Sequence, residues 1–527
     1  MNFTDSVLQE VNSAIELPDD LQEFISLLLL REEKDSYREL NPDLYAYYLI
    51  HYIKNLNLHP SGLNVPLGLL VNREMPEKLQ ALNFYPNSSF TRDFFRYNIP
   101  LRFPQFLRRE HTYILGNTGS GKTQLIQQLI SYDLETNASI VVIDSQGDLI
   151  NTLKRSNLID PERLVIIDPI DSVKYPLALN MFDIGDRKDL SSVDLERHIN
   201  GVVELLNFVF SAVMDSPLTD KQGVVFNFCI RLLLIIPEAT METLVDILEH
   251  GVEKFQDYVN ELPSVAKTFF FNSFHNRDYY QTRIQINRRL FSLLENPTIS
   301  RIFKSPTNSL DISKEMDRGK VILISTDRSL LKRQGCAFFG RYFISLVAQA
   351  MQDRLNRPPE HRRKTYLYID ECGDYLQTED VNVTDILEKG RKYNVGVTLA
   401  HQQINQLPPN VFQAIKTNSA IKMVGTCSYS DSKALKYDMG VDSIDAHRLS
   451  FLTKLRGSEP FYVKVNAGLL ERMEQRSDDD LEAIMVANRA KYSIIVTHPS
   501  KIEKFVEKAE KIDETKGIPK DPLSDYT

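Results

Sequence analysis

One loop in the sequence has the residue types and spacing that bind phosphate. Residues 116–123 read Gly-Asn-Thr-Gly-Ser-Gly-Lys-Thr, which matches Gly-x-x-x-x-Gly-Lys-Thr without interruption. Glycines allow backbone N–H groups to turn inward around an anion, and a helix that begins there adds its positive end. Lys122 could reach the β- and γ-phosphates of a nucleoside triphosphate, and Thr123 could ligate Mg²⁺.

The sequence on both sides of this loop favours a nucleotide site over an accidental glycine turn. Residues 113–115 are an apolar run typical of a buried strand, and residues 124–130 have the apolar spacing of a helix. We therefore predict ATP and Mg²⁺ as cofactors. The predicted nucleotide-binding residues are Gly116, Asn117, Thr118, Gly119, Ser120, Gly121, Lys122, Thr123 and Gln124.

A second segment could supply the metal-side carboxylate and the activation of water. Residues 366–371 read Tyr-Leu-Tyr-Ile-Asp-Glu, an apolar strand that ends in two acids. Asp370 would hold the Mg²⁺ and Glu371 would polarise the attacking water. The alternative is a strand end that carries two solvated acids, but the upstream loop favours the catalytic interpretation.

Two further side chains could complete the site. The apolar residues 396–399 lead into Ala-His-Gln-Gln, where Gln402 could sense the γ-phosphate, with Gln403 as its rival. Arg391 lies in a basic turn before that strand and could reach the phosphates of a neighbouring subunit, as arginine fingers do. The alternatives are a surface amide and a solvated basic turn. The predicted catalytic residues are thus Lys122, Glu371, Arg391 and Gln402.

Short apolar runs predict the framework that positions these residues. Such runs suit strands buried on both faces, as in a parallel sheet covered by helices. Several lead into polar residues, and the carboxyl ends of such strands face the ligand crevice. We predict an α/β fold with a RecA-like, doubly wound, mostly parallel sheet. The runs are residues 140–143, 164–167, 321–324, 366–369, 395–399 and 421–424, and the polar residues near their ends include Asp144, Asp168, Ser325, Asp370 and His401.

The spacing of apolar residues divides the chain into four parts. Residues 1–105 are predicted to be a mainly helical accessory region. Residues 106–186 and 301–500 would form the ATPase domain, interrupted by an all-helical insertion over residues 187–300. Residues 501–527 would form a terminal helix and a disordered tail. Arg283, Arg288 and Arg289, near the end of the insertion, form a basic cluster that could face DNA.

Composition limits the class of protein. The formal net charge of −9 opposes a protein that coats nucleic acid over its whole surface, but permits a local basic channel. No apolar stretch approaches the roughly 18–20 residues that cross a membrane, and the start lacks the features of a signal peptide. The four cysteines have no metal-ligand spacing. We therefore expect a reduced, cytoplasmic protein.

The motifs together resemble the HerA/FtsK superfamily of DNA-pumping ATPases, and most of all its conjugative coupling proteins of the TraG/TraD type. The segments that carry the resemblance are GNTGSGKTQ, VVIDSQGDLI, LALNMFD, YLYIDECGDYL and LEKGRKYNVGVTLAHQQINQL. The resemblance covers roughly residues 110–495. It implies a hexameric ring that threads DNA with ATP between subunits, and it gives Arg391 the role of the arginine that acts on the neighbouring site.

The chain also departs from these families. Coupling proteins usually begin with membrane helices and HerA proteins with a small β-barrel, and neither is evident here. We expect a ring-forming ATPase that translocates DNA, for DNA transfer or with a nuclease in DNA processing or defence. One alternative is a ring whose ATP-dependent assembly activates a partner enzyme. A weaker alternative is a viral-type genome-packaging ATPase.

Overall fold

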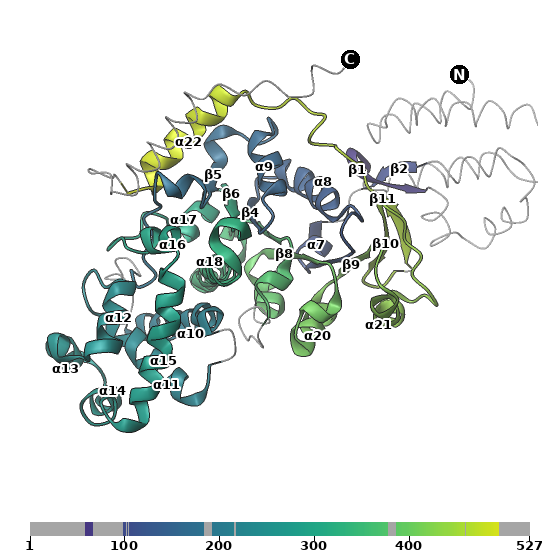
Figure 1. The fold of residues 1–527 in the computed structure, drawn as a ribbon. Helices are drawn as coiled ribbons and strands as arrows, with labels where there is room; N and C mark the ends of the chain where they lie inside the picture. The colour runs from purple at the N-terminus through teal and green to yellow at the C-terminus, as the bar shows by residue number, and fades with distance from the viewer. Residues whose placement is uncertain are drawn as a thin grey trace, which may run out of the picture.

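An eleven-stranded sheet crosses the centre of the structure (Figure 1). The computed structural model describes residues 58–66, 98–101, 103, 105–183, 192–214, 218–377, 386–458 and 460–494. Seven neighbouring strands of the sheet are parallel to one another, which confirms the predicted α/β fold with a mostly parallel sheet. In sheet order they are β9 (Ile421–Val424), β3 (Thr112–Leu115), β8 (Val395–His401), β7 (Thr365–Ile369), β4 (Ser139–Asp144), β6 (Val321–Ser325) and β5 (Leu164–Ile167).

An antiparallel extension continues the sheet beyond β9. Its strands, from β9 outward, are β10 (Ser450–Leu455), β11 (Phe461–Lys464), β1 (Leu58–Pro66) and β2 (Asn98–Leu101). Strands β1 and β2 therefore belong to the sheet, although their region of the chain was predicted to be mainly helical. The rest of that prediction, and the predicted tail over residues 501–527, lie outside the described residues.

Helices cover both faces of the parallel strands. Successive residues of one strand enter different cores: Tyr113 packs in one hydrophobic cluster, and Ile114 in the other. This alternation follows from the two-residue period of a strand, and it explains why the runs are apolar throughout. The helices associated with the sheet are α7 (Gln105–Arg108), α8 (Lys122–Leu134), α9 (Asp148–Arg155), α17 (Ile312–Asp317), α18 (Arg328–Gln352), α20 (Pro409–Asn418), α21 (Tyr429–Met439) and α22 (Asp478–Tyr492).

A group of helices between β5 and β6 projects away from the sheet (Figure 1). Within the described residues from 192 to 302 there is no strand. This segment corresponds to the predicted insertion, and its bounds at 187 and 300 remain a prediction. Its helices are α10 (Ser192–Met214), α11 (Asp220–Leu233), α12 (Met241–His250), α13 (Gln256–Glu261), α14 (Ser264–Thr268), the π-helix η5 (Phe269–Ser273), α15 (Arg277–Leu294) and α16 (Pro297–Ile302).

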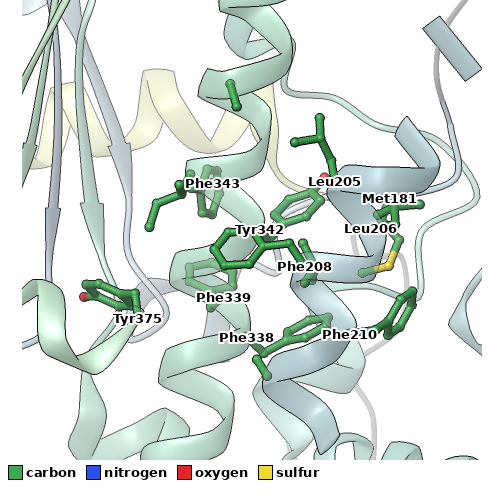
Figure 2. Close-up of a cluster of buried hydrophobic side chains, with 14 of the residues drawn as sticks. Met181, Leu205, Leu206, Phe208, Phe210, Phe338, Phe339, Tyr342, Phe343 and Tyr375 are labelled. Atoms are coloured by element: carbon green, nitrogen blue, oxygen red, sulfur yellow. The ribbon is translucent and has the colours of Figure 1, made fainter. Parts of the chain in front are cut away.

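Aromatic packing joins this helical group to the ATPase core. Figure 2 shows side chains of α10 and α18 facing one another, among them Phe210 and Phe338, whose rings lie 6.5 Å apart. Buried Arg341 of α18 donates to the carbonyl oxygen of Tyr375 at 2.7 Å and to Oγ of Ser211 in α10 at 2.6 Å. The same arginine thus connects the insertion to the segment that follows β7.

The structure corrects one prediction about the insertion. Arg283 does not face solvent: its side chain is buried over the ring of Phe274, and its guanidinium donates to the carbonyl oxygen of Leu248. A buried guanidinium stacked on an aromatic ring cannot contact DNA phosphates, so this part of the prediction was wrong. Arg288 and Arg289 are exposed on α15 and remain available for that role. None of the helices in the described ranges has the length and apolarity needed to cross a membrane.

His111 is a buried histidine that holds the start of β3 against β8. Its Nδ1 accepts the N–H of Val397 at 3.0 Å, so the ring carries its proton on Nε2, which lies 2.8 Å from the carbonyl oxygen of Leu387. Burial lowers the pKa of His111 to about 4. An unfolded chain would bind a proton there below about pH 6.5. Between about pH 4 and about pH 6.5 the folded protein therefore keeps His111 neutral, whereas the unfolded chain would protonate it.

We expect stability to fall between pH 7 and pH 5, with His111 contributing about 2 kcal/mol to the loss in the free energy of unfolding. His111→Asn keeps an acceptor for Val397 but cannot titrate. It should be less stable at pH 7, yet lose less stability on acidification, as measured by chemical denaturation. The exposed His361 offers a matched control, since His361→Asn should leave the pH profile unchanged. A His111→Asn profile parallel to that of the parent would contradict this account.

Candidate nucleotide-binding and hydrolysis site

Residues 116–123 form a tight loop between β3 and α8. Gly119 and Gly121 adopt positive φ angles of 80° and 102°, which side chains rarely tolerate. A Cβ on Gly121 would lie 2.7 Å from Leu449, and one on Gly116 would lie 2.6 Å from Oγ of Ser120. Three glycines of the motif are thus required by backbone angle or by space. Helix α8 begins directly after the loop, at Lys122, so its positive N-terminal end lies at the loop.

Lys122 lies at the first turn of α8 and is almost fully buried. Its Nζ donates to the carbonyl oxygen of Gly116 at 2.8 Å and lies 3.4 Å from Oε1 of Glu371. The predicted phosphate-binding lysine and the predicted catalytic carboxylate are therefore neighbours. An ammonium group placed there can offset the charge of phosphates bound by the loop.

Asp370 and Glu371 follow β7 directly, at the same edge of the sheet as the loop. Oγ1 of Thr123 donates to Oδ2 of Asp370 over 3.4 Å, which brings the two predicted metal ligands together. Burial, reinforced by the charges of Asp144 and Glu371, raises the pKa of Asp370 to about 7. Glu371 adopts a left-handed backbone conformation with φ of 49°. Such strain in a non-glycine residue is typical of functional sites.

Asp144 is a member of the site that the sequence analysis did not include. It ends β4, the strand next to β7, and its side chain is buried. Its Oδ1 accepts the N–H of Gln146 at 2.8 Å, whereas its Oδ2 has no hydrogen-bond partner among the described residues. The polar end of this strand was noted in the sequence, but only the sheet order shows that Asp144 lies beside Asp370.

The side chain of Gln402 connects Glu371 to the loop at residues 116–123. Its Nε2 donates to Oε1 of Glu371 at 2.9 Å, and its Oε1 accepts from Oγ1 of Thr118 at 3.0 Å. The backbone N–H groups of both glutamines donate to Oε1 of Gln406, but the side chain of Gln403 is used within a local turn, where it accepts the backbone N–H of Gln406. The geometry therefore favours Gln402 over Gln403 for a role next to Glu371, the predicted catalytic carboxylate.

The remaining loop residues have mixed environments. Oγ of Ser120 is buried and has no partner among the described residues. Gln124 does not direct its side chain to the loop: its Oε1 accepts from the N–H of Gly468, and its Nε2 donates to Glu471 at 3.0 Å. Any contact of Gln124 with a nucleotide would therefore come from its backbone rather than from its amide group.

Arg391 is not brought to this site within the same chain. It lies in the turn Gly390–Tyr393 before β8, whereas Gln402 follows the last residue of β8. The seven residues of β8 separate these positions by about 20 Å. Arg391 is 69% exposed and lies 2.6 Å from Oε1 of Glu110, which Arg456 also contacts.

These residues fit a nucleoside triphosphate and Mg²⁺. Side chains on Gly116 and Gly121 would collide with Ser120 and Leu449, and the buried hydroxyl of Ser120 has no partner among the described residues. Next to Thr123 lies a buried group of carboxylates with one unpaired oxygen. Oxygen ligands of this kind suit Mg²⁺. The fold and the site therefore define a P-loop nucleoside triphosphatase.

Comparison with known proteins indicates which P-loop nucleoside triphosphatases this chain resembles. The family model described as "Helicase HerA, central domain" matches residues 96–325. The chain also resembles the structure of the plasmid coupling protein TrwB in complex with ADP and Mg²⁺, with 17% identity, a TM-score of 0.51, and coverage of 70% of this chain and 88% of that one. The structure of TrwB with the ATP analogue ADPNP is 18% identical, with a TM-score of 0.52, and the match covers 72% of this chain and 89% of that one. No curated protein sequence matches this chain.

Over the matched residues the chain is therefore similar to the P-loop ATPases of the HerA/FtsK type, and its fold resembles that of the TraG/TraD-type coupling proteins. At such low identity the structural likeness concerns the fold alone. The roles of individual side chains therefore depend on the geometry described above and on experiment.

We expect Gln402→Ala to lower the rate of ATP turnover by about tenfold to a hundredfold, since a lost hydrogen bond to a charged group costs about 1.5–3 kcal/mol. Gln403→Ala is the matched control and should retain turnover. Both variants should still bind nucleotide, as judged by the shift in melting temperature on adding ATP. Equal effects of the two substitutions would mean that Gln402 has no special role.

We expect Glu371→Gln to bind ATP but to hydrolyse it about a hundredfold more slowly or worse, because an amide cannot accept a proton from water. ATP should then accumulate on the protein and be recovered unhydrolysed after gel filtration. Lys122→Ala should instead lose bound ATP, because it removes the buried ammonium from the loop. If Glu371→Gln lost binding to the same extent as Lys122→Ala, Glu371 would have a structural role.

Proposed function

We propose that this chain is an ATP-driven DNA translocase that works as a ring, most simply a homo-hexamer, with each ATP held between two subunits. Two similarities support the motor function. Residues 96–325 match the model of the HerA helicase central domain, and the fold is shared with a bacterial conjugative coupling protein. The observation that carries the shared site is the position of Arg391, at the sheet edge opposite to the loop that binds phosphate.

Each described side chain has a specific task in this proposal. Mg²⁺ would supply a positive charge that offsets charge on the phosphates. Lys122 binds and orients the phosphates, and Thr123 with Asp370 holds the metal. Glu371 accepts the proton of the attacking water, and Gln402 holds Glu371 in position through its 2.9 Å hydrogen bond.

Arg391 can act only on the site of a neighbouring subunit. Within one chain, β8 lies between Arg391 and the catalytic edge, so the guanidinium cannot reach its own Lys122. A ring repeats one heterologous interface, in which one edge of a subunit meets a different surface of the next. Such an arrangement would direct an exposed arginine of one subunit at the phosphates bound by another.

We expect Arg391→Ala to retain ATP binding and to lower hydrolysis by about 10³–10⁵, the usual value of an arginine finger. Arg456→Ala is a matched control because Arg456 contacts the same carboxylate, Glu110, and is also exposed. If Arg391 only neutralised Glu110, the two variants would behave alike. Turnover should therefore fall in the first and persist in the second.

Mixing two inactive variants tests the shared site directly. In a ring that contains both Arg391→Ala and Lys122→Ala subunits, some interfaces combine an intact Lys122 with an intact Arg391. We expect turnover to return on mixing if subunits fire independently. A monomer that hydrolyses ATP at full rate, without dependence on protein concentration, would exclude a shared site.

The motor function itself is tested by turnover with and without DNA. A translocase should hydrolyse ATP faster when DNA is added, and it should displace a protein block from DNA only while it hydrolyses ATP. A ring that merely activates a partner enzyme should show neither effect. The absence of both effects in an intact ring would therefore reject translocation while leaving the ATPase site unaffected.

A further inference from the structure

Two tyrosines on α21 are almost fully exposed. Tyr429 and Tyr437 present 85% and 82% of their surface to solvent, more than any other large hydrophobic side chain among the described residues. They are eight positions apart with Lys433 midway, so the three lie on one face of the helix. The rings are therefore about 12 Å apart along the helix axis. We call this row, Tyr429, Lys433 and Tyr437, the tyrosine stripe.

The fold does not require the tyrosine stripe. The opposite face of α21 attaches the helix to the protein through the buried side chains of Leu435 and Met439. Large aromatic rings bury much surface when they bind. Two of them left in water on a short helix therefore point to a ligand rather than to packing.

The stripe also carries positive charge. Lys433 is exposed, and Nζ of Lys436 lies 4.8 Å from the ring centroid of Tyr437, within cation–π distance. Among the described residues neither lysine has a carboxylate within ion-pair distance. The nearby Asp438 is paired with Lys416 at 2.7 Å. Rings and uncompensated cations thus share one surface of an otherwise acidic chain.

The start of α21, the helix that carries the stripe, is hydrogen-bonded to the hydrolysis site. The N–H of Asn117, in the phosphate-binding loop, donates to the carbonyl oxygen of Thr426 at 2.7 Å. Oδ1 of Asp431, in the first turn of α21, accepts the N–H of Ile404 at 3.2 Å, two residues after Gln402. The start of the helix that carries the stripe is therefore connected to both the loop and the turn that carries Gln402.

We propose that the tyrosine stripe binds single-stranded DNA, with bases stacked on Tyr429 and Tyr437 and phosphates paired with Lys433 and Lys436. This inference rests on the proposed DNA-motor function and names the form of DNA that the motor holds. Stacking accepts any base, because every base has a π-face. A duplex keeps its bases paired and stacked inside, so it could contact the lysines but not cover the rings.

The chain contains no tryptophan, which allows a direct test. Tyr429→Trp and Tyr437→Trp each introduce a single fluorescent reporter at the stripe. Titration with an oligothymidylate should quench the indole emission, whereas a duplex of equal length should leave it nearly unchanged. Tyr175→Trp, at a partly exposed ring outside the stripe and outside α15, is the control and should not respond.

Affinity gives a second measurement. Replacing both stripe tyrosines by alanine should weaken binding of the oligothymidylate by about tenfold or more, because stacking is worth about 1–3 kcal/mol per base. Replacing both by phenylalanine keeps the rings and should preserve affinity. ATP turnover without DNA and the melting temperature should be unchanged in both variants, since neither ring contacts the hydrolysis site.

The outcomes separate this inference from the proposed motor function. If the parent protein binds the oligothymidylate and the double alanine variant binds it equally well, the stripe is not the site, and the motor proposal stands. If the parent binds no DNA and DNA does not stimulate its turnover, both proposals fail. If the alanine variant loses mass in solution while the tryptophan reporters stay unquenched, the stripe is an interface between copies of this chain, and the inference is overturned.

Discussion

The parallel pairing of β8 between β3 and β7 is the constraint on which the site depends. β3 ends before the loop at residues 116–123, β7 ends before Asp370 and Glu371, and β8 ends before Gln402. The pairing places Leu115 opposite His401, and Ile369 opposite Leu399. Because the side-chain period of a strand is two, a slip by one residue would move every side chain to the other face. Close packing on both faces of the sheet therefore fixes the positions of the residues that follow these strands.

The ionisation of the acidic side chains at this edge of the sheet depends on whether a cation is bound there. Three carboxylates, Asp144, Asp370 and Glu371, lie close together, and Nζ of Lys122 lies 3.4 Å from Oε1 of Glu371. Burial of the first two opposes their ionisation. A divalent cation would favour the charged forms and remove that penalty. Without a ligand, the protein is thus less stable with these acids than it would be with neutral side chains at the same positions. Such a loss of stability is typical of functional sites.

Local chemistry made much of this arrangement predictable from the sequence. The loop at residues 116–123 and the acids after residues 366–369 depend on short patterns, and fully apolar runs identified the buried strands. The role of Asp144 could not be predicted, because it depends on which strands are neighbours. Arg283 was misplaced because a charged residue in a helical pattern does not reveal which face is buried. The tyrosine stripe was missed for the same reason: tyrosine is as common in cores as at surfaces.

The environment of Arg391 is compatible with a residue that changes partners. In one subunit its guanidinium pairs with Glu110, and Arg456 contacts the other oxygen of that carboxylate. Glu110 is buried, but Arg391 is 69% exposed, so solvent weakens the pair from the side of the arginine. Departure of Arg391 would still leave Glu110 paired with Arg456, so no carboxylate would lose its only counter-charge. A triphosphate on a neighbouring subunit offers far more negative charge than this shared carboxylate. The pair with Glu110 can therefore hold Arg391 at the edge of the sheet without competing strongly for it.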